Sequence, residues 1–311
     1  MKYELLALLS GHYAAPSDAD LVTVARGDYT AVFLPRSHKQ LFGQTLRRTR
    51  LSSAPKRQAH LETLMSKGTV LPFAPATVFD PQGTDALVAS NAEVFRTLFE
   101  RLRNRVQYQI SVEWTESRVL EQFRNTSEIS PLFAGSSVSG RTVSAAVTKL
   151  ADRLGQCIVS RLSSIACEFS ELPRQRALIA NCVILIEATE EPALDEALAA
   201  IDAIWSDGLR IRQIGPGPAV SFATLTLQRF GKRDLARAHR VLNLSDRPSS
   251  DEIRDARQRR LRDASATVSE IRMAARLALA AHKIGDPGQP VHIVDIWSEG
   301  RATTGDLERV A

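Results

Sequence analysis

The first third of the chain shows the hydrophobic patterns of β-strands. Residues 2–9 form a short apolar run, and the apolar stretches at 21–24 and 29–34 flank a turn signal at residues 26–28. Such runs predict a buried strand followed by a β-hairpin or two nearby strands. Residues 106–114 then alternate between apolar and polar side chains, which is the period of a half-buried strand.

Helical spacing appears between these strands. Apolar side chains recur every three to four residues over 84–105 and, over a shorter distance, in 55–67, while Pro35 favours a helix start before 36–50. Pro72 and Pro75 exclude a regular central strand in the stretch between the helices. We therefore predict an N-terminal α+β domain over residues 1–123, for which ferredoxin-like packing is the economical arrangement.

A second α+β domain is predicted over residues 124–232. Residues 124–142 are rich in Ser, Gly and Pro, which is typical of a linker. Apolar residues then follow one face of a long helix over 143–169. The remaining pattern predicts a strand at 177–188 and a helix from Pro192. Two further strands are predicted at 209–214 and 220–227.

The last part of the chain, residues 233–311, is predicted to be a basic helical extension and tail. Ser249 and Glu252 form the pattern of a capping box, in which each residue caps the backbone of the other. Another helix is expected over 265–283. Residues 291–297 alternate and fit either a strand or an extended tail.

Composition places the chain among globular proteins. Its 311 residues are 44% hydrophobic and 24% charged, which argues against disorder. The three cysteines, at 157, 167 and 182, form no closely spaced pair, so we expect neither a disulfide framework nor a thiolate zinc site. No apolar stretch is long enough to span a bilayer, and the N-terminus lacks the plan of a signal peptide. We therefore expect a soluble, cytoplasmic protein.

The net charge of +5 is unevenly distributed. Residues 36–57 contain seven basic and no acidic residues, and residues 229–262 contain eleven basic and five acidic residues. These segments could form a patch for nucleic acid or an acidic partner, or simply solvated helix faces. The only aromatic residues among them are Phe42 and Phe230, which weakens the nucleic-acid interpretation. Candidate contacts to an acidic partner are Arg257, Arg259 and Arg260.

No pattern in the chain indicates catalysis. None of the six histidines has the spacing of a metal site, and glycine-rich phosphate loops and nucleophile elbows are missing from the sequence. We therefore assign no catalytic, cofactor-binding or metal-binding residue, and expect no cofactor.

Two segments have a more distinctive sequence than an ordinary hydrophobic core requires. One is residues 65–79, and the other is 214–222, where two Gly-Pro pairs specify a rigid turn between strands. Each segment is either a structural turn or a shaped surface for a partner. On the second interpretation the partner-binding candidates are Leu71, Pro72, Phe73, Gly215, Pro216, Gly217, Pro218 and Phe222.

Together these segments resemble the gas vesicle protein family GvpF/GvpL over about residues 1–230. The family has a helix ending in Leu-Met, then a G-x-V-L-P stretch and T-V-F, which stand here at 64–65, 68–72 and 77–79. Its late G-P-W-P-P-Y-S-F signature is matched by G-P-G-P-A-V-S-F at 215–222. The chain departs from the family pattern at Ala74, Pro75, Gly217, Ala219 and Val220.

The resemblance implies a two-domain α+β fold with a ferredoxin-like N-terminal part. It also implies a non-enzymatic accessory or minor structural protein of gas vesicles, found on the vesicle and in the cytoplasm. The implied partners are the small hydrophobic GvpA-like shell protein and other accessory proteins, with no membrane. The alternative is a nucleic-acid-associated binding protein that uses the basic segments 36–57 and 229–262.

Overall fold

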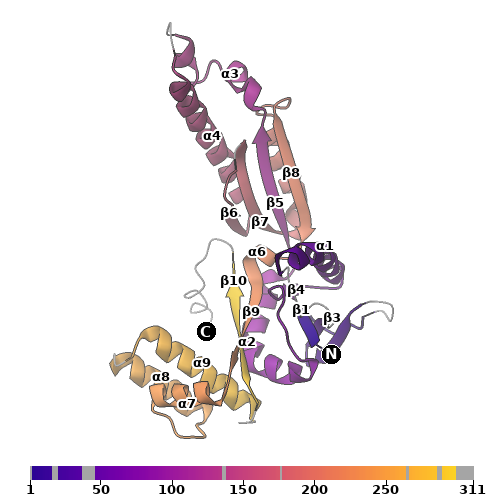
Figure 1. Ribbon diagram of the computed structural model, residues 1–311, viewed down its shortest axis with the longest axis vertical. Helices are drawn as coiled ribbons and strands as arrows, with labels where there is room; N and C mark the ends of the chain where they lie inside the picture. The colour runs from indigo at the N-terminus through magenta and orange to yellow at the C-terminus, as the bar shows by residue number, and fades with distance from the viewer. Residues whose placement is uncertain are drawn as a thin grey trace. The chain divides into compact units, whose positions relative to one another are not determined.

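A computed structural model describes residues 2–15, 20–36, 46–134, 138–175, 177–263, 266–285 and 289–298. The chain divides into two compact units, the first made of residues 1–103 and 223–311 and the second of residues 104–222 (Figure 1). Both combine helices with antiparallel sheets, as expected for an α+β protein. The division differs from the predicted one: the boundary expected after residue 123 lies inside the second unit, and residues 233–311 belong to the first.

The larger sheet of the first unit has the strand order β2-β3-β1-β4. Its central strand β1 buries Leu5 to Leu9, and Gly27, with a φ of 55°, closes the predicted hairpin. Pro72 ends the short strand β4 at the sheet edge, where a missing backbone donor is tolerated. The strands are β1 (Lys2–Ser10), β2 (Val22–Arg26), β3 (Tyr29–Arg36) and β4 (Val70–Pro72).

The first two helices are α1 (Leu46–Met65) and α2 (Thr84–Leu102). α1 is continuous through Pro55, whereas the sequence predicted two helices with a break near this position. The helix start predicted at Pro35 is also wrong, because β3 continues to Arg36 and pairs with β1 there. Residues 37–45 lie outside the described part of the chain.

The C-terminal part adds three helices and a two-stranded sheet to the first unit. The helices are α7 (Lys232–Leu242), α8 (Ser250–Asp263) and α9 (Val268–Ile284), and β9 (Thr224–Phe230) pairs with β10 (Val291–Trp297). The predicted capping box is confirmed: Glu252 N–H donates to Ser249 Oγ at 3.2 Å, and Ser249 N–H donates to a Glu252 carboxylate oxygen at 2.7 Å. Because they pair with β9 along their whole length, residues 291–297 are a strand rather than an extended tail.

Strand β10 is joined to α2 by the side chain of Asn91, which is 3% exposed. Asn91 Nδ2 donates to the carbonyls of Leu87 and His292, both at 2.9 Å. Its Oδ1 accepts the N–H of Val294 at 2.9 Å. One carboxamide thus satisfies an acceptor and a donor of a strand some two hundred residues away in the sequence, which makes the C-terminal segment part of the first unit.

The second unit is one four-stranded antiparallel sheet covered by helices on one face. The strand order is β6-β7-β5-β8, and the elements follow one another as β-α-β-β-α-β. That element order is the one of ferredoxin-like folds. Ferredoxin-like packing was expected in the N-terminal part, whereas this element order occurs in the second unit. The elements are β5 (Arg105–Trp114), α4 (Gly140–Ser163), β6 (Glu168–Glu171), β7 (Leu178–Glu187), α5 (Glu191–Asp202) and β8 (Leu209–Gly217).

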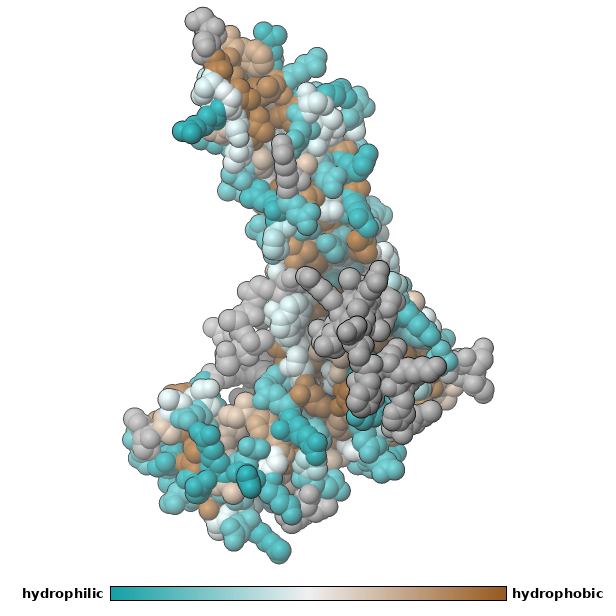
Figure 2. Space-filling model, in the orientation of Figure 1, coloured by the Kyte–Doolittle hydropathy of each residue, from teal (hydrophilic) through white to brown (hydrophobic). Residues whose placement is uncertain are grey.

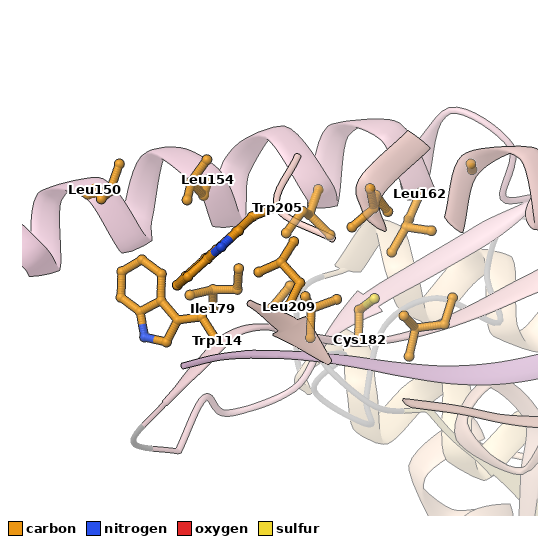
Figure 3. Packing of buried hydrophobic residues seen from close by; sticks show 14 of the residues in the cluster. Trp114, Leu150, Leu154, Leu162, Ile179, Cys182, Trp205 and Leu209 are labelled. Atoms are coloured by element: carbon orange, nitrogen blue, oxygen red, sulfur yellow. The ribbon is translucent and has the colours of Figure 1, made fainter. Parts of the chain in front are cut away.

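The core of the second unit lies between α4 and the sheet (Figure 3). Leu150, Leu154 and Leu162 of α4 belong to the same buried cluster as Ile179 and Cys182 of β7. Burial raises the pKa of the Cys182 thiol to about 12. α4 ends at Ser163, six residues before the predicted end, because the chain turns there into β6.

The segment predicted to be a linker packs into the second unit. Ile129 is fully buried, and the 3-10 helix η4 (Ser130–Phe133) follows it. Arg153 of α4 forms an ion pair of 2.5 Å with Glu128, which lowers the pKa of that carboxyl to about 2. The apolar residues of this segment therefore close one end of the core. The segment does not separate two domains.

We predict that Asn91→Ala destabilises the first unit. The substitution leaves a buried N–H and a buried carbonyl of β10 without partners, which costs about 1–3 kcal/mol. Urea denaturation followed by circular dichroism measures the loss. Glu93→Ala, on an exposed position of the same helix, is the control and should unfold close to wild type. Equal unfolding curves for the two variants would contradict the assigned role of Asn91.

Candidate partner-binding surface

The first specific segment lies mostly in the core. Leu71 is 0% and Phe73 1% exposed, and Pro72 is buried between them. The three residues extend β4 along β1, where Leu71 pairs with Leu8. Their interpretation as an exposed contact surface is therefore corrected: their side chains build the interior of the first unit.

A mostly buried ion pair, with side chains 12% and 14% exposed, holds the turn that follows β4. Arg57 Nη1 lies 2.7 Å from Glu4 Oε1, and Arg57 Nη2 donates to the carbonyls of Leu6 and Phe73. Glu4 Oε1 also accepts the N–H of Ala76 at 3.0 Å. Burial lowers the pKa of Arg57, and the charge of Glu4 opposes that shift. Arg57 thus closes the turn onto β1.

The same turn also contacts β9, with which the chain returns to the first unit. Ala74 N–H donates to the carbonyl of Leu225 in β9 at 2.7 Å, and Leu5 N–H donates to the carbonyl of Thr77 at 2.8 Å. Within this segment Pro75 and Val78 remain exposed, Val78 to 49%. The family-like sequence of residues 68–79 therefore specifies how β1, β4 and β9 are joined.

The second specific segment is partly structural and partly exposed. Gly215 has a φ of 140°, and a Cβ at this position would lie 2.6 Å from the Tyr108 ring, so glycine is required. The Gly215–Pro216 peptide bond is cis. Ser221 N–H donates to Gln107 Oε1 at 2.8 Å, which holds the end of the segment near β5. Gly217, Pro218 and Phe222 are buried.

The predicted strand after this turn begins later than expected. Val220–Ala223 form one helical turn, α6, and β9 starts only at Thr224. β9 pairs with β10 rather than with β8, so the Gly-Pro segment does not connect two paired strands. Its accessible residues are Ile214, which is 49% exposed, Gly215 and Pro216.

These accessible residues continue an exposed sheet edge. β8 is the last strand of the sheet, and Arg210, Arg212 and Gln213 are exposed along it. Hydrophilic side chains are visible on this border of the second unit (Figure 2). The two arginines lie outside the basic clusters of the sequence and were not predicted as contacts; the alternation Leu-Arg-Ile-Arg-Gln-Ile was the available signal.

The second basic segment divides into structural and free cations. Arg260 Nε donates to the Val241 carbonyl at 2.7 Å and joins α8 to the end of α7. Arg237 and Arg254 face Glu270 and Asp251 at 3.6 and 2.8 Å. Arg259 is exposed and Arg257 half-buried. Of the three candidate arginines, Arg257 and Arg259 therefore remain candidate contacts to an acidic partner, and Arg260 does not.

Among the described residues, no three His, Cys, Asp or Glu side chains are grouped as a metal site would require. None of the described helices has the length and apolar character that crossing a bilayer demands.

Residues 10–224 match the family model described as gas vesicle synthesis protein GvpL/GvpF. The chain belongs to the GvpL/GvpF family. The resemblance inferred from the two specific segments is thereby confirmed. α7, α8, α9 and β10 lie beyond the residues that match the family model.

Two solved structures of GvpF share the fold. The crystal structure of GvpF from Anabaena sp. PCC7120 aligns with a TM-score of 0.53 at 18% identity, covering 70% of this chain and 95% of that one. GvpF from Microcystis aeruginosa gives 0.50 at 20% identity, covering 68% and 94%. Comparison with curated protein sequences gives no match. At these identities the two structures support the fold alone.

We predict that the neighbouring residues Lys56 and Arg57 differ sharply in importance. Arg57→Met removes the nearer cation from a mostly buried pair and leaves Glu4 with the more distant Arg36, at 3.6 Å, which costs about 1–3 kcal/mol. Lys56→Met breaks only an exposed contact with Asp20. Thermal unfolding should therefore show a clearly lower midpoint for Arg57→Met and an unchanged one for Lys56→Met. A matching loss in both variants would refute the structural role of Arg57.

Proposed function

We propose that this protein is a non-enzymatic accessory or minor structural protein of gas vesicles, acting on the vesicle and in the cytoplasm. It binds the hydrophobic GvpA-like shell protein and supports vesicle assembly together with other accessory proteins. The observation that carries the proposal is the family match over residues 10–224. The exposed edge of β8 adds a place where a partner can bind.

The physical argument concerns the shell protein before assembly. A subunit with a strongly apolar face aggregates unless another surface covers it. A folded partner that covers this face and then releases it needs accessible backbone groups and a few apolar contacts, and no catalytic residue. Ile214 and Pro216 at the end of β8 provide such contacts on the second unit.

The proposal is tested by binding and by deletion. The purified full chain should capture purified GvpA-like shell protein, and cells lacking the gene should form few or no gas vesicles, as seen by electron microscopy. Restoring the gene should restore vesicles. Normal vesicles in the deletion strain, together with no capture of the shell protein, would disprove the proposal.

The basic segment 229–262 is a second candidate contact. Arg257 and Arg259 make no ion pair within the described residues and could hold an acidic accessory protein. The alternative, binding of nucleic acid, lacks support from stacking: Phe230 packs against the helical core of α7 to α9, and Phe42 lies outside the described residues.

We predict that Arg257→Glu together with Arg259→Glu weakens the accessory complex without unfolding the protein. Arg260 stays unchanged, because its side chain joins two helices. Co-purification from cells measures the complex, and Lys149→Glu, at an exposed position of α4, is the control for charge alone. Unchanged recovery would show that these arginines form only a solvated face. Steeply salt-dependent binding to DNA or RNA would favour the alternative function.

A further inference from the structure

Strand β8 has one side of its backbone free for another strand. Among the described strands it pairs with β5 alone, and Thr115 N–H donates to the Gly208 carbonyl at 2.9 Å. Backbone groups alternate in direction along an antiparallel ladder. The N–H and C=O of Arg210 and Arg212 therefore face β5, and those of Ile211 and Gln213 point away from the sheet.

The side chains along this edge also alternate. The register with β5 places Arg210 beside Glu113, Arg212 beside Ser111 and Ile214 beside Gln109. These three side chains lie on the sheet face opposite the buried core, because Leu209 and Ile211 occupy the core side. Neither arginine forms an ion pair within the part of the chain that the structure describes.

β8 is longer than β6, the strand at the other edge of the sheet. β6, at that edge, has four residues, whereas β8 has nine. Proteins commonly protect exposed edges with short strands, charges or proline. β8 has the charges and Pro216 but not the short length, so it presents several backbone donors and acceptors in a row.

We infer that the β8 edge accepts an extended segment of the shell protein as a fifth, antiparallel strand. The inference rests on the proposed function and specifies its contact. Backbone hydrogen bonds to Ile211 and Gln213 supply affinity. Carboxylates at two alternate positions lie beside Arg210 and Arg212, and an apolar side chain lies beside Ile214, which sets the register. The charge of the arginines selects an acidic segment.

The test uses a substitution that closes the edge without touching the ladder to β5. Gln213→Pro removes an N–H that points away from the sheet, and proline is tolerated on the outer side of an edge strand. Gln213→Ala keeps that N–H and is the matched control. In capture of the shell protein, Gln213→Pro should bind roughly tenfold more weakly than Gln213→Ala. Circular dichroism verifies that both variants fold.

A peptide probe tests the same edge on the unchanged protein. The peptide Val-Thr-Glu-Val-Glu-Thr, labelled for fluorescence anisotropy, can place its two Glu residues beside Arg212 and Arg210. N-methylation of its second and fourth residues should abolish binding, because those N–H groups face β8. N-methylation of its third and fifth residues should not. Replacing both Glu by Lys should weaken binding roughly two- to tenfold.

The outcomes separate the inference from the proposed function. If wild-type protein captures the shell protein and Gln213→Pro captures it equally well, the edge inference fails and the proposed function stands. If wild-type protein captures none, the proposed function fails. Equal binding of the two N-methylated peptides also overturns the inference. So does concentration-dependent pairing of β8 with a second copy of the chain that excludes the shell protein.

Discussion

The first unit is built from two separate parts of the chain, because the chain leaves it after α2 and returns only at β9. Its fold therefore depends on contacts between these two parts. Asn91 provides such contacts, since its buried carboxamide satisfies one acceptor and one donor of β10. A buried backbone group without a partner is energetically costly, so this amide favours the docking of β10 on α2. The helices α7 to α9 are thereby integrated into the same unit as β1 to β4.

The family-like segments act mainly through structure. Arg57 and Glu4 close the turn after β4, and the Gly215 backbone passes so near Tyr108 that no side chain fits. These contacts explain why the segments are distinctive in sequence although most of their side chains are buried. What they expose is small, chiefly Val78, Ile214 and Pro216, and the proposed contact surface continues from the last two along β8.

Several elements could be predicted because their pattern is local. The hairpin at Gly27, the alternation of 106–114 and the capping box at Ser249 each depend on neighbouring residues, and each is confirmed. The ends of helices were less predictable. α4 stops at Ser163 because the chain turns into β6 there, and α1 continues through Pro55; neither depends on helical periodicity alone.

The family, the α+β class and most of the strands could be predicted, because they follow from short-range spacing and side-chain type. Which strands share a sheet depends instead on contacts between distant residues: β5 is central in the second unit, and β10 belongs to the first. Tertiary contacts likewise make Arg57 and Arg260 structural, while Arg259 is exposed. The reason is physical, since burial and pairing depend on residues far apart in the chain, and equal side chains in one basic segment meet different surroundings.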